Sequence, residues 1–310
     1  MEVHHDIREV CSRCRPFLTM GTFDGVHRGH RAILDSLRED ARENGVPSIV
    51  MVFEPHPRQV VDPAGAAEIR LLCTPEERIE RIADSGIDHL VVMPFTHQLA
   101  RLDYGNFVRD YLFGPLQMQR YYAGYDHGFG RNRKGGFEAL KALGEELGFS
   151  VLKTEALIEG GKTLSSSLIR GTLEEGDVSG AARMLGYPYR VRGQVVYGNR
   201  IGHTIGYPTA NIQIDHPQKM IPAMGVYAVE VKINREKFGG MLNIGFRPTI
   251  DLHSVTIEVH IFDFDRDIYG MEIDVCFLGR IREERRFGSL SELRAQLSRD
   301  QVSAKEVIGN

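Results

Sequence analysis

The stretch that decides the fold of the first half of the chain is Met20–His30, MGTFDGVHRGH. It follows Phe17–Met20, a short apolar run that is typical of a buried strand. Behind it, apolar residues recur with the spacing of one helix face, at Ile33, Leu34, Leu37 and Ala41. Gly45 can end that helix. The stretch is therefore a turn between a strand and a helix, and it is rich in glycine and histidine.

The rest of the first half continues the same alternation up to about residue 155. Thr74–Glu77 is a capping box with proline at the first helical position, so it starts another helix. The order predicts an α/β domain with a Rossmann-like, doubly wound parallel sheet, in which ligands bind at the carboxyl ends of the strands. The strands that we expect are Phe17–Met20, Ser48–Phe53, His89–Phe95, Arg120–Gly124 and Phe149–Lys153.

From about residue 189 the apolar pattern becomes short, alternating and rich in β-branched residues. Gly and Asp clusters separate these runs, with no helical segment between them, which predicts a small antiparallel β-barrel. A terminal helix should follow, because Ser289 and Glu292 form a capping box. The apolar face expected for that helix consists of Leu290, Leu293 and Leu297.

Length and composition also limit the possibilities. A chain of 310 residues is longer than a single hydrophobic core usually supports, so two domains are expected. Because Pro188 interrupts a helical stretch, we expect the domains to be 1–186 and 187–310. With a net charge of -4, nothing in the composition suggests bulk attraction to nucleic acid or acidic membranes. No apolar run approaches membrane-spanning length, and the N-terminus lacks an apolar signal core, so we expect a cytoplasmic protein without nucleic-acid or membrane partners. The sequence does not predict an oligomeric state.

The N-terminal segment contains the CxxC pair Cys11 and Cys14, just after His4 and His5. These four residues could build a zinc site, but no second CxxC supports it. Four cysteines in a long chain also argue against a disulfide framework. We expect surface cysteines in a mobile N-terminus.

His27 and His30 in the opening stretch could serve a metal, a base or a phosphate. The glycines do not form a dinucleotide fingerprint or a P-loop, and no further metal ligands follow at a set spacing. A helix N-terminus beside Gly25 and Gly29 suits an anion, because free N–H groups and a partial positive charge meet there. From the residues alone, a phosphate site and a plain β–α turn remain about equally supported.

Further motifs distinguish between a phosphate site and a plain β–α turn. The pattern GTFDGVHRGH, then FEPHP (Phe53–Pro57), GYDHGFGRNRKG (Gly124–Gly135) and LSSSLIRGTLEEGDVSGAARMLGYPY (Leu164–Tyr189) resemble the nucleotidyltransferase module of bacterial bifunctional riboflavin kinase/FAD synthetases. The resemblance implies that His27, His30 and Arg170 act on ATP during adenylyl transfer. The nucleotide-binding residues that it implies are Gly21, Phe23, Asp24, Gly25, Gly29, Ser165, Ser166 and Ser167. Ser167 stands where the family commonly has Thr.

The second half resembles the riboflavin kinase part of the same family. The stretch VVYGNRIGHTIGYPTANI (Val195–Ile212) contains its PTAN signature. The resemblance implies that Thr209 and Asn211 bind Mg²⁺ beside ATP and that Glu258 is the general base for the riboflavin 5′-hydroxyl. A glycine loop would cover the ATP phosphates, and its residues are Gly198, Gly202 and Gly206. The flavin-binding residues implied in the two halves are His56, Asp126, Arg247 and Arg282.

Some positions depart from the family pattern. His203 stands where the glycine loop usually has Arg, Tyr207 where Phe is frequent, and Phe246 where Thr is common. His56 lies between two prolines, so a structural turn is as well supported for it as a flavin contact. The function expected is phosphorylation of riboflavin to FMN and adenylylation of FMN to FAD. One retained activity, or a non-catalytic flavin- or nucleotide-binding regulator, is the alternative.

Overall fold

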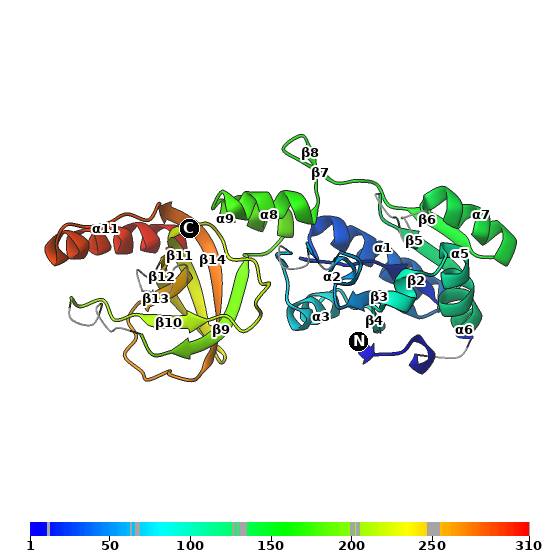
Figure 1. The fold of residues 1–310 in the computed structure, drawn as a ribbon, viewed down its shortest axis with the longest axis horizontal. Coiled ribbons are helices and arrows are strands. Elements are labelled where there is room, and N and C mark those ends of the chain that lie inside the picture. Colours follow the sequence, from blue (N-terminus) through cyan, green and yellow to red (C-terminus); the bar gives the residue numbers. More distant parts are fainter. Residues whose placement is uncertain are drawn as a thin grey trace. The chain divides into compact units, whose positions relative to one another are not determined.

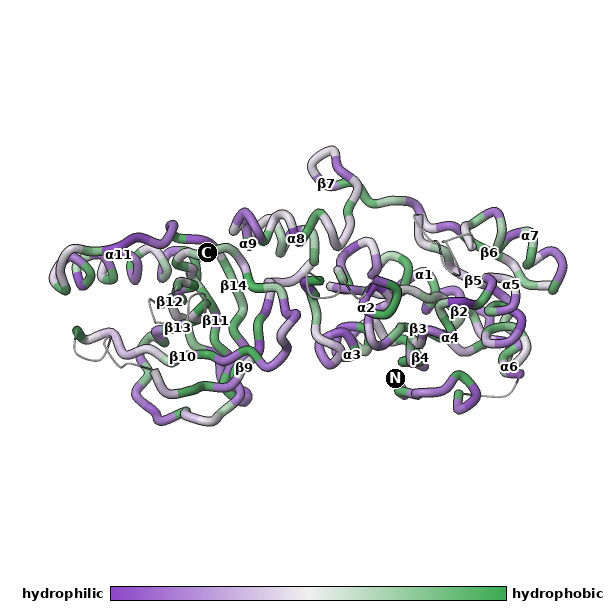
Figure 2. Tube along the Cα trace, viewed as in Figure 1, coloured by the Kyte–Doolittle hydropathy of each residue, from purple (hydrophilic) through white to green (hydrophobic). Residues whose placement is uncertain are grey.

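The computed structural model describes residues 1–10, 13–62, 64–65, 69–125, 128, 130, 135–198, 202, 205–246 and 255–309. The chain divides into two compact units, Met1–Ser166 and Ser167–Asn310 (Figure 1). Hydrophobic residues follow the strands of both units, and hydrophilic residues are frequent on the helices (Figure 2).

The first unit is built on a six-stranded sheet in the order β1-β4-β3-β2-β5-β6, in which every pairing is parallel. This confirms the doubly wound α/β domain and all five strands expected from the sequence. The chain winds in opposite directions on the two sides of β2, so the switch point lies between β2 and β5. The strands are β1 (Glu2–His4), β2 (Phe17–Met20), β3 (Ser48–Glu54), β4 (His89–Pro94), β5 (Arg120–Ala123) and β6 (Ser150–Lys153).

Helices cover both faces of this sheet and bury a separate apolar cluster on each. α1 begins after His27 and ends at Gly45. The φ of Gly45 is 64°, a left-handed conformation that glycine adopts without strain because it has no Cβ atom. α3 begins with the expected capping box. The helices are α1 (Arg28–Asn44), α2 (Pro57–Val61), α3 (Pro75–Ala83), α4 (His97–Ala100), α5 (Tyr104–Phe107), the π-helix η3 (Val108–Phe113), α6 (Gly114–Leu116) and α7 (Phe137–Leu147). A small hairpin, β7 (Ile158–Glu159) and β8 (Lys162–Thr163), follows the sheet.

The N-terminal segment corrects one expectation. Glu2–His4 forms the edge strand β1, and the short 3₁₀ helix η1 (Ile7–Glu9) places Ile7 in the core with 2% of its surface exposed. A mobile N-terminus is therefore wrong for these residues. Cys14 is disulfide-bonded, and Cys11 lies outside the described residues.

The second unit begins one residue into the helix α8 (Ser166–Glu174), and it continues through α9 (Val178–Leu185) into a closed barrel. All pairings in the barrel are antiparallel, which confirms the expected architecture. α9 packs on β14, and Ser179 donates its hydroxyl to the Leu278 carbonyl at 3.0 Å. The strands are β9 (Arg190–Val196), β10 (Ala210–Gln213), β11 (Gly225–Ile233), β12 (Glu236–Phe246), β13 (Val255–Ile261) and β14 (Glu272–Arg282).

The terminal helix α11 (Leu290–Gly309) lies against β11, β12 and β14. The expected helix is confirmed, and Leu297 of the expected leucine face packs against an apolar cluster of the barrel, but Leu290 does not belong to the buried face. Leu290 is 58% exposed, whereas Asp300 is 1% exposed and accepts hydrogen bonds from Arg282. An ion pair, which apolar spacing does not predict, therefore helps to fix the helix on the barrel.

Candidate active sites

The turn after β2 has an unusual backbone. Phe23 and Val26 have φ angles of 48° and 35°, a region that non-glycine residues rarely adopt, and Gly25 between them has φ 82°. Such conformations cost free energy and cluster at functional sites. The turn also lies at the carboxyl end of β2, beside the switch point of the sheet. This is where an open α/β sheet binds ligands.

His27 and His30 form one stacked pair in this turn. Their ring centroids are 3.7 Å apart with planes 16° from parallel. His27 is the N-cap of α1, and its Nδ1 accepts the backbone N–H of His30 at 3.3 Å. Because Nδ1 uses its lone pair there, a neutral His27 carries its proton on Nε2, which can donate. A Cβ on Gly29 would lie 3.1 Å from the His27 ring, so glycine gives the ring its place.

Burial favours the neutral form of both imidazoles. Burial lowers the pKa of His27 from 6.5 to about 4, and burial followed by the neighbouring His27 lowers the pKa of His30 well below its usual value. The Nδ1 of His30 is buried without a hydrogen-bond partner among the described residues. A buried polar atom without a partner requires an explanation, and a ligand bound at this turn would supply one.

Asp24 and Ser166 connect the turn to the serine-rich segment. The Asp24 carboxylate is 3% exposed and accepts the backbone N–H groups of Leu72 and Cys73 at 3.2 and 3.0 Å. The Asp24 carbonyl accepts the hydroxyl of Ser166 at 2.9 Å. The structure thus brings the first residue of α8 to the histidine turn, as the motif order implied. The Asp24 carboxylate itself holds the neighbouring chain.

Arg78 on α3 was missed by the sequence reasoning. Its guanidinium, 7% exposed, donates to the Thr22 carbonyl at 3.1 Å, the Phe53 carbonyl at 3.3 Å and Glu54 Oε2 at 2.7 Å. It therefore ties the GTFDG turn to the end of β3, where FEPHP begins. A signal existed, because Arg78 stands four residues before the apolar Ile82 and so lies on the buried face of its helix.

The other predicted residues of the first half are placed as follows. His56 is the N-cap of α2, where its Nδ1 accepts the Arg58 N–H at 3.2 Å. Arg170 lies one helical turn beyond Ser166 on α8, and Ser167 between them is exposed. Asp126 lies outside the described residues.

On the barrel, Thr209, Asn211 and Glu258 come together. Asn211 on β10 pairs in register with Glu258 on β13, so the two side chains project from the same face. The Thr209 hydroxyl lies 3.5 Å from Glu258 Oε2, and all three residues are half-buried. Hydroxyl, amide and carboxylate oxygens are hard donors of the kind that Mg²⁺ prefers. The residues present therefore fit the predicted metal.

Two glycines of the predicted loop lie close to these side chains. A Cβ on Gly198 would lie 2.1 Å from Asn211 Nδ2, and one on Gly202 would lie 2.2 Å from the Tyr207 carbonyl oxygen and 3.5 Å from Thr209 Oγ1. Gly206 has φ 83°. Lack of space or a positive φ thus explains why glycine stands at each of these positions. Gly198 and Gly202 let the backbone pass directly beside the predicted metal ligands.

The remaining predicted residues of the barrel are less closely connected to this group. Arg282 forms a bidentate ion pair with Asp300, donating from Nε to Oδ1 at 3.0 Å and from Nη2 to Oδ2 at 2.8 Å. Tyr207 packs edge-on against His260, with ring centroids 5.2 Å apart. Phe246 at the end of β12 is 50% exposed. Arg247 and His203 lie outside the described residues.

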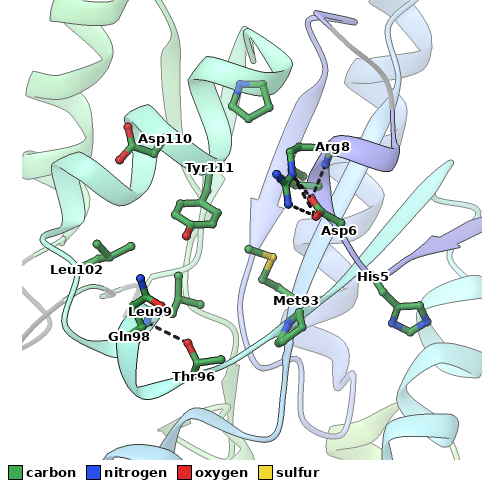
Figure 3. A pocket seen from close by; sticks show the side chains of 13 residues that line it. His5, Asp6, Arg8, Met93, Thr96, Gln98, Leu99, Leu102, Asp110 and Tyr111 are labelled. Atoms are coloured by element: carbon green, nitrogen blue, oxygen red, sulfur yellow. Dashed lines mark hydrogen bonds and ion pairs between the residues drawn. The ribbon is translucent and has the colours of Figure 1, made fainter.

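A cavity of about 520 Å³ opens in the first unit at the carboxyl end of β4 (Figure 3). The N-terminal segment forms one side, and the chain from α4 to α6 forms the other. None of the predicted site residues that the structure describes lines it. The lining residues are His5, Asp6, Ile7, Arg8, Met93, Pro94, Thr96, Gln98, Leu99, Leu102, Asp110, Tyr111 and Pro115.

Comparison with protein families assigns both halves. Residues 12–168 match the family model of FAD synthetase, and residues 185–308 match that of riboflavin kinase. Both families are transferases that use ATP, so the chain is a two-domain transferase.

Curated relatives match over nearly the whole chain. The bifunctional riboflavin kinase/FMN adenylyltransferase of Escherichia coli K12 is 40% identical over 94% of this chain and 92% of its own length. The enzyme of the same name from Bacillus subtilis is 36% identical over 99% of this chain and 96% of its own. The chain belongs to the family of bifunctional riboflavin kinase/FMN adenylyltransferases.

A solved structure has the same fold. It is titled a macrolide-efflux protein from Streptococcus pneumoniae, with a TM-score of 0.90, 32% identity and coverage of 98% of both chains. Among the helices of the present structure, as far as it is described, none combines the length and the apolar character needed to cross a membrane.

Proposed function

We propose that the barrel phosphorylates riboflavin with ATP and Mg²⁺ to give FMN, and that the first unit then adenylylates FMN to FAD. The observation that carries this proposal is the presence of two separate polar groups. One is the stacked, neutral histidine pair at the switch point of the sheet. The other is the in-register Asn211–Glu258 pair on the barrel.

In the kinase step, Glu258 would accept the proton of the riboflavin 5′-hydroxyl as its oxygen attacks the γ-phosphorus of ATP and ADP leaves. Thr209 and Asn211 would hold Mg²⁺, which neutralises charge on the transferred phosphoryl group. The 3.5 Å distance between Thr209 Oγ1 and Glu258 Oε2 supports this division of roles, because it places the base beside the metal ligands. Gly198 and Gly202 let the loop backbone approach the same place.

In the adenylyl step, an oxygen of the FMN phosphate would attack the α-phosphorus of ATP, and pyrophosphate would leave. The nucleophile is already charged, so positioning and charge stabilisation are the tasks left to the protein. His27 and His30 would act as neutral N–H donors to the phosphates, together with the serine turn and Arg170 on α8. The buried, unpaired Nδ1 of His30 supports this role.

Other roles remain predictions. We infer flavin contacts for His56, Asp126, Arg247 and Arg282 from the family resemblance alone. The N-cap bond of His56 and the ion pair of Arg282 show that both side chains also have structural partners. The domain limits 1–186 and 187–310 and a cytoplasmic location are also proposals, and the net charge of -4 supports the absence of nucleic-acid and membrane partners.

The test is to supply riboflavin, ATP and Mg²⁺ to the full chain and to separate the products. We expect FMN and then FAD. Glu258→Gln should lower FMN formation by about 10²–10⁴-fold and leave FMN-to-FAD conversion unchanged. His30→Ala should do the reverse, with a loss of about 10²–10³-fold in adenylylation.

Matched controls are Glu272→Gln and His97→Ala, because both side chains are exposed. Neither should change either activity. The proposal fails if wild-type protein forms neither product, or if either site variant, while folded, loses both activities. Tight flavin binding without turnover would instead identify a regulator.

A further inference from the structure

The edge strand β1 places three possible metal ligands on one face of the sheet. β1 pairs in parallel with β4, with Glu2 opposite His89 and His4 opposite Val91. Side chains of opposite residues share a face, and so do those two apart along a strand. Glu2, His4 and His89 therefore lie together. They stand at the amino end of β4, whereas the histidine turn follows the carboxyl end of β2.

The three ligand atoms have the spacing of one face of a tetrahedron. His4 Nε2 lies 3.2 Å from His89 Nδ1, and Glu2 Oε2 lies 3.7 and 3.5 Å from these nitrogens. Bonds of about 2.0–2.1 Å at tetrahedral angles separate neighbouring ligand atoms by roughly 3.3 Å. All three distances are within a few tenths of an ångström of that value. A metal ion could thus contact all three atoms after small side-chain adjustments.

The burial of these side chains also suits a site. The side chains of His4 and His89 are 13% and 18% exposed, so the sheet largely fixes their rings. Glu2 is 74% exposed, which leaves the carboxylate mobile and a fourth position open to water. Two imidazoles and one carboxylate favour borderline metals such as Zn²⁺, Co²⁺ or Ni²⁺ over Mg²⁺, which prefers oxygen.

We propose that Glu2, His4 and His89 bind a divalent transition-metal ion of the zinc type and thereby tie β1 to β4. This site is separate from the Mg²⁺ ligands proposed on the barrel and does not depend on the proposed function. A bound ion would replace the hydrogen bond between the two histidine nitrogens. It would also anchor the N-terminal segment whose residues His5–Arg8 form one side of the cavity at the end of β4.

The experiment titrates metal-free full-length protein, without an affinity tag, with Co²⁺ and follows the visible absorption of tetrahedral Co²⁺. Zn²⁺ then competes for the site. We expect one tetrahedral Co²⁺ per chain, and a Zn²⁺-dependent rise in the unfolding temperature. His4→Ala and His89→Ala should each weaken metal binding by about 100-fold or more. Loss of a residue that only hydrogen-bonds to a metal ligand already lowers metal affinity by about 10–100-fold.

Controls separate this site from others nearby. His5→Ala, next to His4 but outside the cluster, should bind as wild type does. A Cys11→Ser/Cys14→Ser variant should also retain binding, which separates the site from a thiolate site. If His89→Ala fails to fold, His4→Ala and Glu2→Gln on the short edge strand still provide the test. Unchanged Co²⁺ affinity in folded His4→Ala, or no Co²⁺ spectrum in wild type, would overturn the proposal.

Discussion

His27 links the stability of the first unit to pH. Burial lowers its pKa from 6.5 to about 4, so between these values the unfolded chain binds a proton that the native chain does not. The stabilisation is complete above the unfolded pKa and is lost as the pH falls towards 4. The full loss is roughly 3 kcal/mol, and His30 adds to it in the same direction.

We expect His27→Asn to reduce this pH dependence, while His30 keeps its own contribution. Asparagine can still accept the N-cap bond of α1, but it does not titrate. Urea unfolding of the first unit at about pH 7 and about pH 5 measures the difference. His97→Asn, an exposed position, should retain the wild-type dependence. An equal pH dependence in His27→Asn and wild type would show that His27 is not responsible.

Helix α3 acts on the histidine turn through a single side chain. Arg78→Met removes the buried donors that hold the Thr22 and Phe53 carbonyls and leaves Glu54 without its cation. Because Glu54 is 35% exposed and water can solvate it, the main cost is the carbonyls left without donors, and we expect a loss of about 1–3 kcal/mol in the first unit. FAD formation should fall with it, while FMN formation continues. Thermal unfolding and the two activities measure this, and Arg101→Met, an exposed change, is the control.

Helix α11 provides a test of the role of Arg282. Arg282→Met leaves the buried Asp300 carboxylate without its guanidinium, and we expect the barrel to lose about 3–5 kcal/mol. Arg282→Met/Asp300→Leu should recover most of that loss, because an apolar pair can replace a buried ion pair. Thermal unfolding checks stability, and the KM for riboflavin checks flavin binding. A KM that stays raised in the stable double variant would support the flavin contact, and an unchanged unfolding temperature in Arg282→Met would contradict the structural role.

Elements with a strong local pattern were predicted, and those that depend on tertiary pairing were not. The strands β2 to β6 are apolar runs between turn residues, so their sequence alone indicates them. β1 has only three residues, two of them polar, and exists because β4 pairs with it. The buried faces of α3 and α11 include Arg78 and Asp300, whose burial depends on partners far away in the sequence.

At the scale of the site, the positions of the predicted residues followed from motif order, but some of their contacts did not. The in-register pairing of Asn211 with Glu258 needs the closed barrel, in which β10 and β13 are neighbours although far apart in the sequence. The neutral state of the histidine pair needs burial that spacing does not reveal. Motif order thus indicates which side chains are candidates for a site, and the tertiary fold decides which of them meet, their charge and their hydrogen bonds.

At the scale of the whole molecule, motif resemblance and packing assign the helices α8 and α9 to different halves of the chain. The family resemblance places them with the adenylyl-transferring module, and α8 carries Ser167 and Arg170. The contacts group them with the barrel, because α9 packs on β14 and Ser179 bonds to Leu278. Cutting the chain before α8 should therefore remove adenylylation by the first half. Cutting it after α9 should instead destabilise the barrel.

Four fragments test this. We expect 1–186 to convert FMN to FAD and 1–166 not to, because the shorter one lacks Ser167 and Arg170. We expect 187–310 to unfold at a temperature lower by about 5 °C or more than 167–310, because it exposes the surface that α9 covers. Product chromatography and thermal unfolding measure these outcomes, and riboflavin phosphorylation by both barrel fragments is the control for folding. Equal unfolding temperatures would show that α9 does not stabilise the barrel, and FAD formation by 1–166 would remove Arg170 from the proposed site.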